Sequence, residues 1–473
     1  MSNGTTLLVP ASLDTITTYI LLEQESWFEK ETEFLPRLLT PGATVLDIGS
    51  NVGVYSLPLA RCLGSTGKVY SYEPGVQPRR LLENSCVLNN LTNICVLGHA
   101  LSNRVGRASL APAVSSELRS LTETSSNDGE TVDVTALDEE ERIHQWGRID
   151  FVKIDAEGEE RRILEGGQRF FAQQSPLVMF EVKAQDRVDK GISDAFCSLG
   201  YEIFRLLPGA PILVPVIPDE RLDTFELNLF AAKPDRVSRL VDGGWLVGDE
   251  IPWLPNADAR SAALELLRRQ AFGPALSRMT APAVGSPYHD ALAGYAQWRL
   301  ESSRPSERYA ALRFSHAVLR QLCGSQNQLE WFSTFARVAW DLGDREGATA
   351  ALVKILALAK GNVVITQPFW PAGPRFDQTA PGSNIAHWFV VSALEQLERA
   401  AGHSSMFVQP YINLDWLRQQ PFVSTEMERR HVLRFLRGGK RLAVPRRLTQ
   451  PAIDHVNADL WRSGVIPNTF VNQ

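Results

Sequence analysis

The sequence lacks three features that would assign a protein class at once. No run of about 18 apolar residues occurs, so we expect no transmembrane segment. No basic stretch followed by an apolar stretch opens the sequence, so we expect no signal peptide. The five cysteines are odd in number and form no Cys-x-x-Cys pair, which favours reduced thiols and offers no zinc site. These absences predict a cytoplasmic protein.

The composition is that of a globular chain long enough for several domains. The 473 residues are 44% hydrophobic and 22% charged. At about 150 residues per domain, this length predicts two or three domains. The formal net charge of −6 argues against nucleic acid as a partner, because domains that bind nucleic acid are usually basic.

Strand-like and helix-like stretches alternate in the first half of the sequence. Short apolar runs between turn residues predict buried parallel strands at 44–48, 68–72, 93–97, 150–154 and 177–181. Helices are expected at 54–63, 78–89 and 157–164. The alternation predicts an α/β fold with a doubly wound, mostly parallel, Rossmann-like sheet. Two further strands, 201–206 and 227–231, have no clear helix between them and predict an antiparallel closing hairpin.

The second half reads as a mainly α-helical domain. We expect a first domain at 1–238, a linker at 239–256 and the helical domain at 257–473, where Asn256 caps the first helix. Two stretches offset by about 40 residues, 294–312 and 334–352, each predict a helix hairpin that weakly resembles a tetratricopeptide repeat.

Two other stretches of the helical half leave alternatives open. The aromatic and proline-rich stretch 367–377 predicts either a loop buried by its aromatic side chains or a face for a sugar ring. The arginine-rich stretch 429–447 predicts either a solvated helix face or a site for an anionic carrier.

The turn after the first strand, Val45–Gly53, invites a nucleotide interpretation. A dinucleotide fingerprint that begins at Gly49 would need glycines at positions 51 and 54, where the chain has Asn51 and Val54. Asp47 lies at the strand end, where its carboxylate would repel phosphates. The pattern therefore argues against a dinucleotide, although an ordinary strand-to-helix turn would have the same glycines.

S-adenosyl-L-methionine has no phosphate and suits the same residues. Asp47 can bind its ammonium group, and backbone N–H groups near Gly49 and at the helix start after Gly53 can bind its carboxylate. Glu73 ends the next strand and can bind the ribose diol. Asn51 is expected near the methionine part of the cofactor.

Three stretches carry a family resemblance: Val45–Leu57, Val69–Pro74 and Asp150–Glu160. They resemble the FkbM family of S-adenosylmethionine-dependent methyltransferases, and the Lys-Ile-Asp-x-Glu-Gly-x-Glu pattern of the third is the most specific. The resemblance covers about residues 15–235 and implies a class I methyltransferase fold. It usually implies methylation of a hydroxyl on a sugar or a secondary metabolite. The stretch from Ala100 to Ser102 also matches, and we place Ala100 among the cofactor-binding residues.

The candidate catalytic residues are carboxylates at strand ends: Asp155, Glu157 and Glu181. Asp155 is the first candidate for the base that accepts or orients the proton of an acceptor hydroxyl, and the other two are second candidates. The same three carboxylates would alternatively hold a divalent cation that polarises the hydroxyl. Lys153, inside a buried strand, is expected to pair with a nearby carboxylate. Glu29 precedes the core, where the family often places a lid.

The leading functional hypothesis is an O-methyltransferase that acts on a hydroxyl of a sugar, a glycan or a secondary metabolite. A second hypothesis is a protein or RNA methyltransferase that recruits its macromolecule through the helical domain. A third is a non-catalytic scaffold with a relic methyltransferase fold. The expected partners are a small hydroxyl acceptor and, through the helical domain, a protein.

Overall fold

The computed structural model describes residues 1–111, 121–122, 129–184, 187–188, 190–217, 222–223, 225–249, 251–361, 363–410, 414–440, 442–464 and 466. The chain forms two compact units. Unit 1 is Met1–Leu206, Leu213–Gly243 and Val432–Gln473, and unit 2 is Leu207–Ile212 and Gly244–His431. Each unit contains the residues that contact one another most, including separate parts of the sequence. The predicted domain boundaries at 238 and 257 stay predictions.

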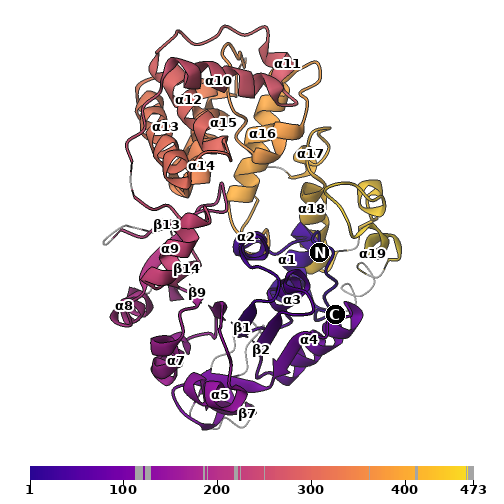
Figure 1. The fold of residues 1–473 in the computed structure, drawn as a ribbon. Coiled ribbons are helices and arrows are strands. Elements are labelled where there is room, and N and C mark those ends of the chain that lie inside the picture. Colours follow the sequence, from indigo (N-terminus) through magenta and orange to yellow (C-terminus); the bar gives the residue numbers. More distant parts are fainter. Residues whose placement is uncertain are drawn as a thin grey trace. The chain divides into compact units, whose positions relative to one another are not determined.

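Unit 1 is built around an eight-stranded sheet with the order β13-β12-β14-β9-β8-β1-β2-β3 (Figure 1). The strands from β9 to β3 run parallel, and β14, β12 and β13 join them in antiparallel pairs. The strands are β1 (Thr44–Ile48), β2 (Lys68–Tyr72), β3 (Ile94–Leu97), β8 (Phe151–Ile154), β9 (Leu177–Glu181), β12 (Glu202–Leu206), β13 (Leu213–Pro215) and β14 (Asn228–Ala232). The predicted doubly wound sheet and its antiparallel closing strands are confirmed, and β13 adds a strand that the sequence pattern did not indicate.

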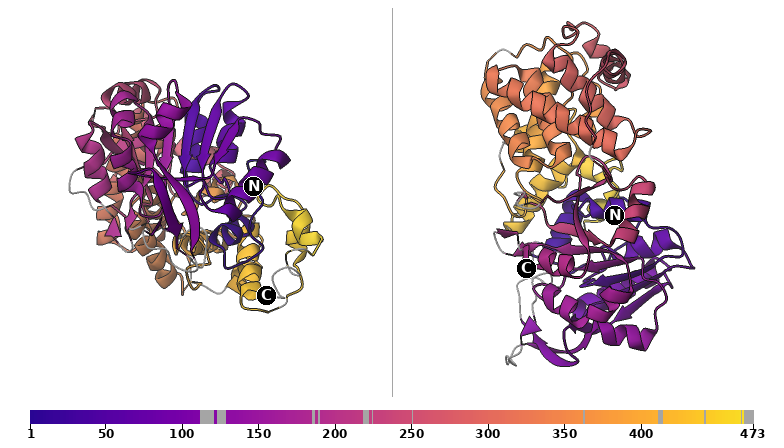
Figure 2. Two further views of the ribbon diagram at one scale, coloured as in Figure 1. Left: turned by 90° about the horizontal axis from the view of Figure 1, so that it is seen from below. Right: turned by 60° about the vertical axis from the view of Figure 1, so that its left-hand side comes forward.

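Helices cover both faces of this sheet (Figure 2). All four residues of β8 are buried, as a parallel strand between two helical layers requires. On one face Val152 packs in a core with Phe170 and Phe171, and the other face has a core that includes Leu57 and Leu82. These two cores fix the sheet, and with it the edge at which the parallel strands end.

The helices of unit 1 before residue 243 are α1 (Ile16–Gln24), α2 (Glu31–Leu38), α3 (Ser56–Leu63), α4 (Val76–Leu88), α5 (Leu137–His144), α6 (Glu160–Gly166), α7 (Gln168–Gln173), α8 (Lys190–Ser198) and α9 (Pro234–Asp242). The helix predicted to begin at residue 157 begins at Glu160. The helix begins later than predicted because Glu157 (φ +48°) and Gly158 (φ +97°) have positive φ angles, which a right-handed α-helix does not contain.

A second, smaller sheet follows β3 and has the order β4-β7-β5-β6. Its strands are β4 (His99–Ser102), β5 (Gly106–Leu110), β6 (Leu121–Thr122) and β7 (Glu130–Ala136), and a separate pair joins β10 (Lys183–Ala184) to β11 (Arg187–Val188). The sequence analysis did not predict these strands.

Unit 2 is helical: its elements are α10 (Ala257–Arg269), α11 (Gly273–Leu276), α12 (Pro287–Arg299), α13 (Pro305–Ser325), α14 (Leu329–Leu342), α15 (Arg345–Leu358), the 3₁₀ turn η2 (Pro374–Gln378), α16 (Ile385–Ala400), α17 (Leu414–Leu417) and the start of α18 (Thr425–Arg437). The Asn256 side chain accepts a hydrogen bond from Ala259 N, as the predicted cap requires. The helix pairs α12–α13 and α14–α15 pack together, whereas their tetratricopeptide character stays a prediction. No helix in the described ranges is long and apolar enough to cross a membrane.

The aromatic side chains of the stretch 367–377 are buried. Phe369 and Trp370 have no exposed surface, and Phe376 is 1% exposed. Trp370 packs edge-on against Tyr295 with ring centroids 5.2 Å apart. The stretch therefore fills the core of unit 2 and does not offer these rings to a sugar.

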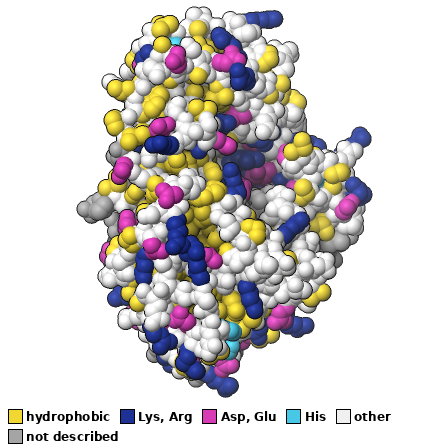
Figure 3. All heavy atoms as spheres, in the orientation of Figure 1, with side chains coloured by type: hydrophobic (Ala, Val, Ile, Leu, Met, Phe, Trp, Pro, Cys, Tyr) yellow, Lys and Arg dark blue, Asp and Glu magenta, His cyan; other side chains and the backbone are white. Residues whose placement is uncertain are grey.

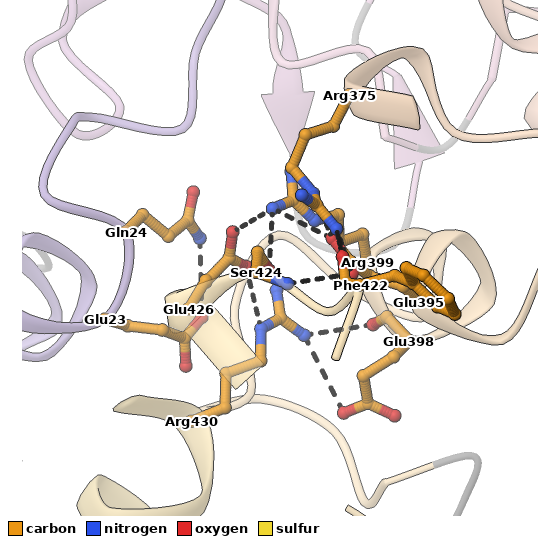
Figure 4. Close-up of polar contacts among 10 residues, drawn as sticks. All are labelled: Glu23, Gln24, Arg375, Glu395, Glu398, Arg399, Phe422, Ser424, Glu426 and Arg430. Carbon is orange, nitrogen blue, oxygen red and sulfur yellow. Dashed lines mark hydrogen bonds and ion pairs between the residues drawn. The ribbon is translucent and has the colours of Figure 1, made fainter. Parts of the chain in front are cut away.

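The arginine-rich stretch begins in the interior of unit 2, where Arg429 and Arg430 are each 2% exposed. Arg430 donates to Glu426 Oε1 at 2.9 Å and lies 3.7 Å from Glu398 Oε1 (Figure 4). Arg399 continues this network through Glu426, at 2.7 Å. The first part of the stretch is thus a buried ion-pair network, not the predicted solvated face. On the face drawn in Figure 3, basic and acidic side chains are interspersed.

The C-terminal part of unit 1 contains η3 (Arg446–Thr449) and α19 (Ala458–Arg462) and contacts Glu25, the residue after α1. His455 is fully buried, and its Nδ1 lies 3.0 Å from Glu25 Oε1. The Glu25 carboxylate also accepts hydrogen bonds from Val456 N and Asn457 N, both at 2.8 Å. We call these contacts the Glu25–His455 latch.

Because the Glu25–His455 latch is buried, we expect a large loss of stability when the side chain of Glu25 or of His455 is removed. Glu25→Ala or His455→Ala should lower the free energy of unfolding by about 3–5 kcal/mol, because each leaves a buried polar partner unpaired. Denaturant titration measures this loss. The double variant should lose less than the sum of the single variants, since they share one interaction.

Glu265→Ala is the control for this prediction, because Glu265 is 50% exposed and pairs with Arg269 on the surface of α10. It should cost at most about 1 kcal/mol. Additive losses in the double variant would show that Glu25 and His455 act separately.

Candidate functional site

Acidic side chains gather where the parallel strands end, as the sequence predicted. Asp47 is the fourth residue of β1, Glu73 follows β2, Asp155 follows β8, and Glu181 ends β9. Because β9, β8, β1 and β2 are neighbours in the sheet, their carboxyl ends form one edge.

The turn after β1 is pressed against the end of β8. Gly49 has φ +79°, and a Cβ atom there would lie 1.7 Å from the carbonyl oxygen of Asp155. Gly53 has φ +92°, and a Cβ atom there would lie 2.4 Å from the side chain of Leu82. Only glycine fits these two positions, so the turn brings the start of α3 close to the edge of the sheet.

Glu73 joins the turns that follow β1 and β2. Its carboxylate accepts hydrogen bonds from Asn51 N at 2.9 Å and from Gly75 N at 2.7 Å. Asn51 holds a left-handed backbone with φ +46°, which lets its N–H face Glu73. The Arg79 guanidinium donates to the carbonyl oxygens of Glu73 and Pro74 at 3.1 and 2.8 Å. The predicted contacts of Glu73 and Asn51 with a cofactor stay predictions.

The Asp47 carboxylate is buried beneath the glycine turn. It has no exposed surface and accepts a hydrogen bond from Ser56 Oγ at 2.6 Å. Its other oxygen lies 3.9 Å from Lys153 Nζ and is buried without a hydrogen-bond partner. Burial raises the pKa of Asp47, and Lys153 and Ser56 oppose this rise. The structure therefore places Asp47 as a support of the turn, and its predicted contact with an ammonium group stays a prediction.

Lys153 pairs with a carboxylate, as predicted. Its Nζ donates to Asp155 Oδ2 at 2.7 Å, and its side chain is 4% exposed. Burial lowers the pKa of Lys153, but the charges of Asp155 and Asp47 outweigh this effect, and the pKa is raised overall. Lys153 thus stays a cation at the centre of the edge.

The turn after Asp155 is closed by its own acidic residues. Glu160 accepts hydrogen bonds from Ala156 N at 3.0 Å and from Gly158 N at 3.1 Å. Glu159 accepts a hydrogen bond from Ser102 Oγ at 2.6 Å and pairs with Arg162 at 2.8 Å. These two side chains hold the turn before α6, and Asp155 and Glu157 lie with Glu181 at the edge.

Asp155, Glu157 and Glu181 meet at this edge, with ligand atoms within 4.8 Å of one another. Burial raises the pKa of Glu181 to about 9, and repulsion by Asp155 and Glu157 adds to the rise. Three carboxyl groups this close share either a proton or a cation. A protonated Glu181 would donate a hydrogen bond, which leaves Asp155 as the better acceptor.

Ala100 lies apart from these carboxylates in the smaller sheet. It is 5% exposed and packs in a core with Leu110, Val132 and Val134. The structure thus gives its side chain a packing role, and its predicted contact with a cofactor is untested.

Tyr55 and Glu29 belong to the edge, and the sequence analysis did not connect them. The Tyr55 hydroxyl donates to Glu29 Oε2, and Lys153 Nζ lies 5.1 Å from the centre of the Tyr55 ring. Nearby, burial and the charge of Glu29 raise the pKa of Glu31 to about 8. The one available signal was the position of Glu29 shortly before the first strand.

Comparison with known proteins finds a family match for part of the chain. Residues 47–203 match the family model described as a methyltransferase FkbM domain. This match confirms the resemblance inferred from the sequence and, with the strand order, the class I methyltransferase fold. No curated protein is similar enough to count as a match.

Several solved structures are distantly similar. The methyltransferase FkbM of Methylobacillus flagellatus KT is 17% identical, covers 41% of this chain and 44% of its own, and has a TM-score of 0.29. The SAM-dependent O-methyltransferase of Thermotoga maritima is 16% identical over 43% and 64% of the two chains, with a TM-score of 0.25. The O-methyltransferase of Bacillus cereus, in complex with SAH, is 15% identical over 43% and 80%, with a TM-score of 0.26. This chain spans less than half of the Methylobacillus protein.

The close approach at Gly49 predicts that a methyl group there disrupts the site. Gly49→Ala should cost more than about 2 kcal/mol of unfolding free energy, because the new Cβ meets a backbone oxygen and the residue has a positive φ. Gly158→Ala is the matched control. It has the same sign of φ but nothing within 4 Å, so it should cost only about 1–2 kcal/mol. If Gly49→Ala and Gly158→Ala lost the same unfolding free energy in urea titrations, the predicted clash at Gly49 would be contradicted.

The raised pKa of Glu181 predicts a pH dependence of stability. Between the ordinary value of 4.5 and about 9, the folded state keeps a proton that the unfolded state releases. The stabilisation from Glu181 is therefore complete below pH 4.5 and is lost as the pH rises through about 9. Unfolding titrations at pH 6 and pH 9 should show a smaller decrease for Glu181→Gln than for the unmodified chain. If the free energy of unfolding decreased equally in Glu181→Gln and in the unmodified chain, Glu181 would already be ionised in the folded state at pH 6.

Proposed function

We propose that unit 1 is an S-adenosyl-L-methionine-dependent O-methyltransferase that acts on a hydroxyl of a sugar, a glycan or a secondary metabolite. The observation that carries the proposal is the set of carboxylates at the ends of β8 and β9, beside the glycine turn of β1. The family match at residues 47–203 supports methyl transfer.

The residues of this edge fit S-adenosylmethionine. The donor is a cation at its sulfur and carries no phosphate, and the edge presents the carboxylates of Asp155, Glu157 and Glu181. Glu73, 9% exposed, would hold the ribose hydroxyls, and Gly49 and Gly53 would let the backbone approach the ligand. The donor supplies an electrophilic methyl group to this site.

Asp155 has the position of the base. Methyl transfer forms a bond from the acceptor oxygen to the methyl carbon, breaks the bond from carbon to sulfur, and releases the hydroxyl proton. Asp155 would take that proton on its carboxylate, since Lys153 holds this group in place at 2.7 Å. Glu181 would orient the hydroxyl through a hydrogen bond.

Calorimetry and a transfer assay test the proposal. The purified full chain should bind S-adenosylmethionine and S-adenosylhomocysteine, and Glu73→Ala should weaken both about tenfold or more, because a hydrogen-bonded carboxylate is lost. Asp155→Asn should keep binding of S-adenosylhomocysteine, whose sulfur is uncharged. At saturating S-adenosylmethionine it should lose at least about 100-fold in transfer of a radiolabelled methyl group to a lysate of a strain that lacks the gene.

Absence of donor binding by the unmodified chain would refute the proposal. Unchanged transfer by Asp155→Asn would remove Asp155 from the reaction. A chelator in the same assay separates the two interpretations of the carboxylates, because transfer that survives chelation excludes a metal-assisted route.

A further inference from the structure

Glu29 brings a carboxylate to the site from outside the residues that match the family model. It lies between α1 and α2, whereas the family match begins at residue 47. The Tyr55 hydroxyl donates to Glu29, and the Tyr55 ring lies beside Lys153. Lys153 in turn donates to Asp155. A continuous series of contacts therefore connects Glu29 with the candidate base.

Carboxyl groups outnumber the ammonium group at the centre of this series. Lys153 interacts electrostatically with four of them, namely Asp155, Asp47, Glu29 and Glu181. One ammonium group cannot neutralise four ionised carboxyl groups, and burial with mutual repulsion raises the pKa of Asp47, Glu29 and Glu181. Burial raises the pKa of Glu29, the hydrogen bond from Tyr55 opposes that rise, and Asp155 adds to it. The site thus takes up a further positive charge, which is either a proton on one of these carboxyl groups or a cationic ligand.

We propose that Glu29 makes the site selective for the positively charged methyl donor over its demethylated product. This inference rests on the proposed function. S-adenosylmethionine and S-adenosylhomocysteine differ by one methyl group and by the positive charge on sulfur. Because the pKa of Glu29 is raised, its carboxyl group would release its proton when the sulfonium binds, and the resulting carboxylate would attract the cation but leave the neutral thioether almost unaffected. Glu29 would therefore favour donor entry and product release.

Calorimetry of the full chain with each of the two ligands tests this selectivity. Glu29→Gln keeps an oxygen that accepts from the Tyr55 hydroxyl and removes only the charge. It should weaken S-adenosylmethionine binding by about five- to tenfold and change S-adenosylhomocysteine binding by less than about twofold. Glu33→Gln is the control, since Glu33 is 70% exposed and pairs with Lys30 at 3.6 Å on the same segment. It should change neither affinity.

Tyr55→Phe is the second variant, because it keeps the ring beside Lys153 and releases Glu29 from its hydrogen bond. Loss of this hydrogen bond disfavours the ionised form of Glu29, so we expect the same selective loss of donor affinity. The thermal unfolding midpoint of Tyr55→Phe, compared with that of the unmodified chain, shows that the variant is folded. Equal losses for both ligands, or unchanged selectivity in both variants, would overturn the role of Glu29. If the unmodified chain binds neither ligand, the proposed function itself fails.

Discussion

The ion pair between Lys153 and Asp155 is the interaction on which the candidate site depends. Lys153 extends from the middle of the sheet and lies between Asp155 and Asp47, so one ammonium group connects the ends of β8 and β1. Without it, these two carboxylates would face each other in an interior that solvates charge poorly. The same lysine fixes the environment of Tyr55, and the geometry of the whole edge follows from where this cation lies.

Local patterns in the sequence predicted much of the sheet. The ranges 44–48, 68–72 and 177–181 match β1, β2 and β9 to the residue, because a parallel strand buried on both faces is a short apolar run between turns. Asp155 and Glu181 were predicted for the same reason, as residues at strand ends. Glu29 could not be connected to the site in this way, since its contact with Tyr55 joins residues 26 positions apart and leaves no periodic signal.

Unit 2 shows the same limit for charged residues. A run that contains Arg429 and Arg430 reads as a solvated face, because arginine is rarely buried without a partner. The partners of Arg430 are Glu426, one helical turn away, and Glu398, on α16. A contact between separate helices cannot be read from the spacing within one helix, so burial of this network is visible only in the structure.

The Glu25–His455 latch has a consequence for how the protein is made. Unit 1 is discontinuous, and roughly 200 residues separate Gly243 from His455 in the order of synthesis. At about 5–20 residues per second, the ribosome needs roughly 10–40 seconds to cross that stretch. During this interval all strands of the eight-stranded sheet have been synthesised, but His455, the partner of Glu25 in the latch, has not. Unit 1 therefore acquires its last contacts only after the helical unit, which is inserted into it in the order of the sequence, has been translated.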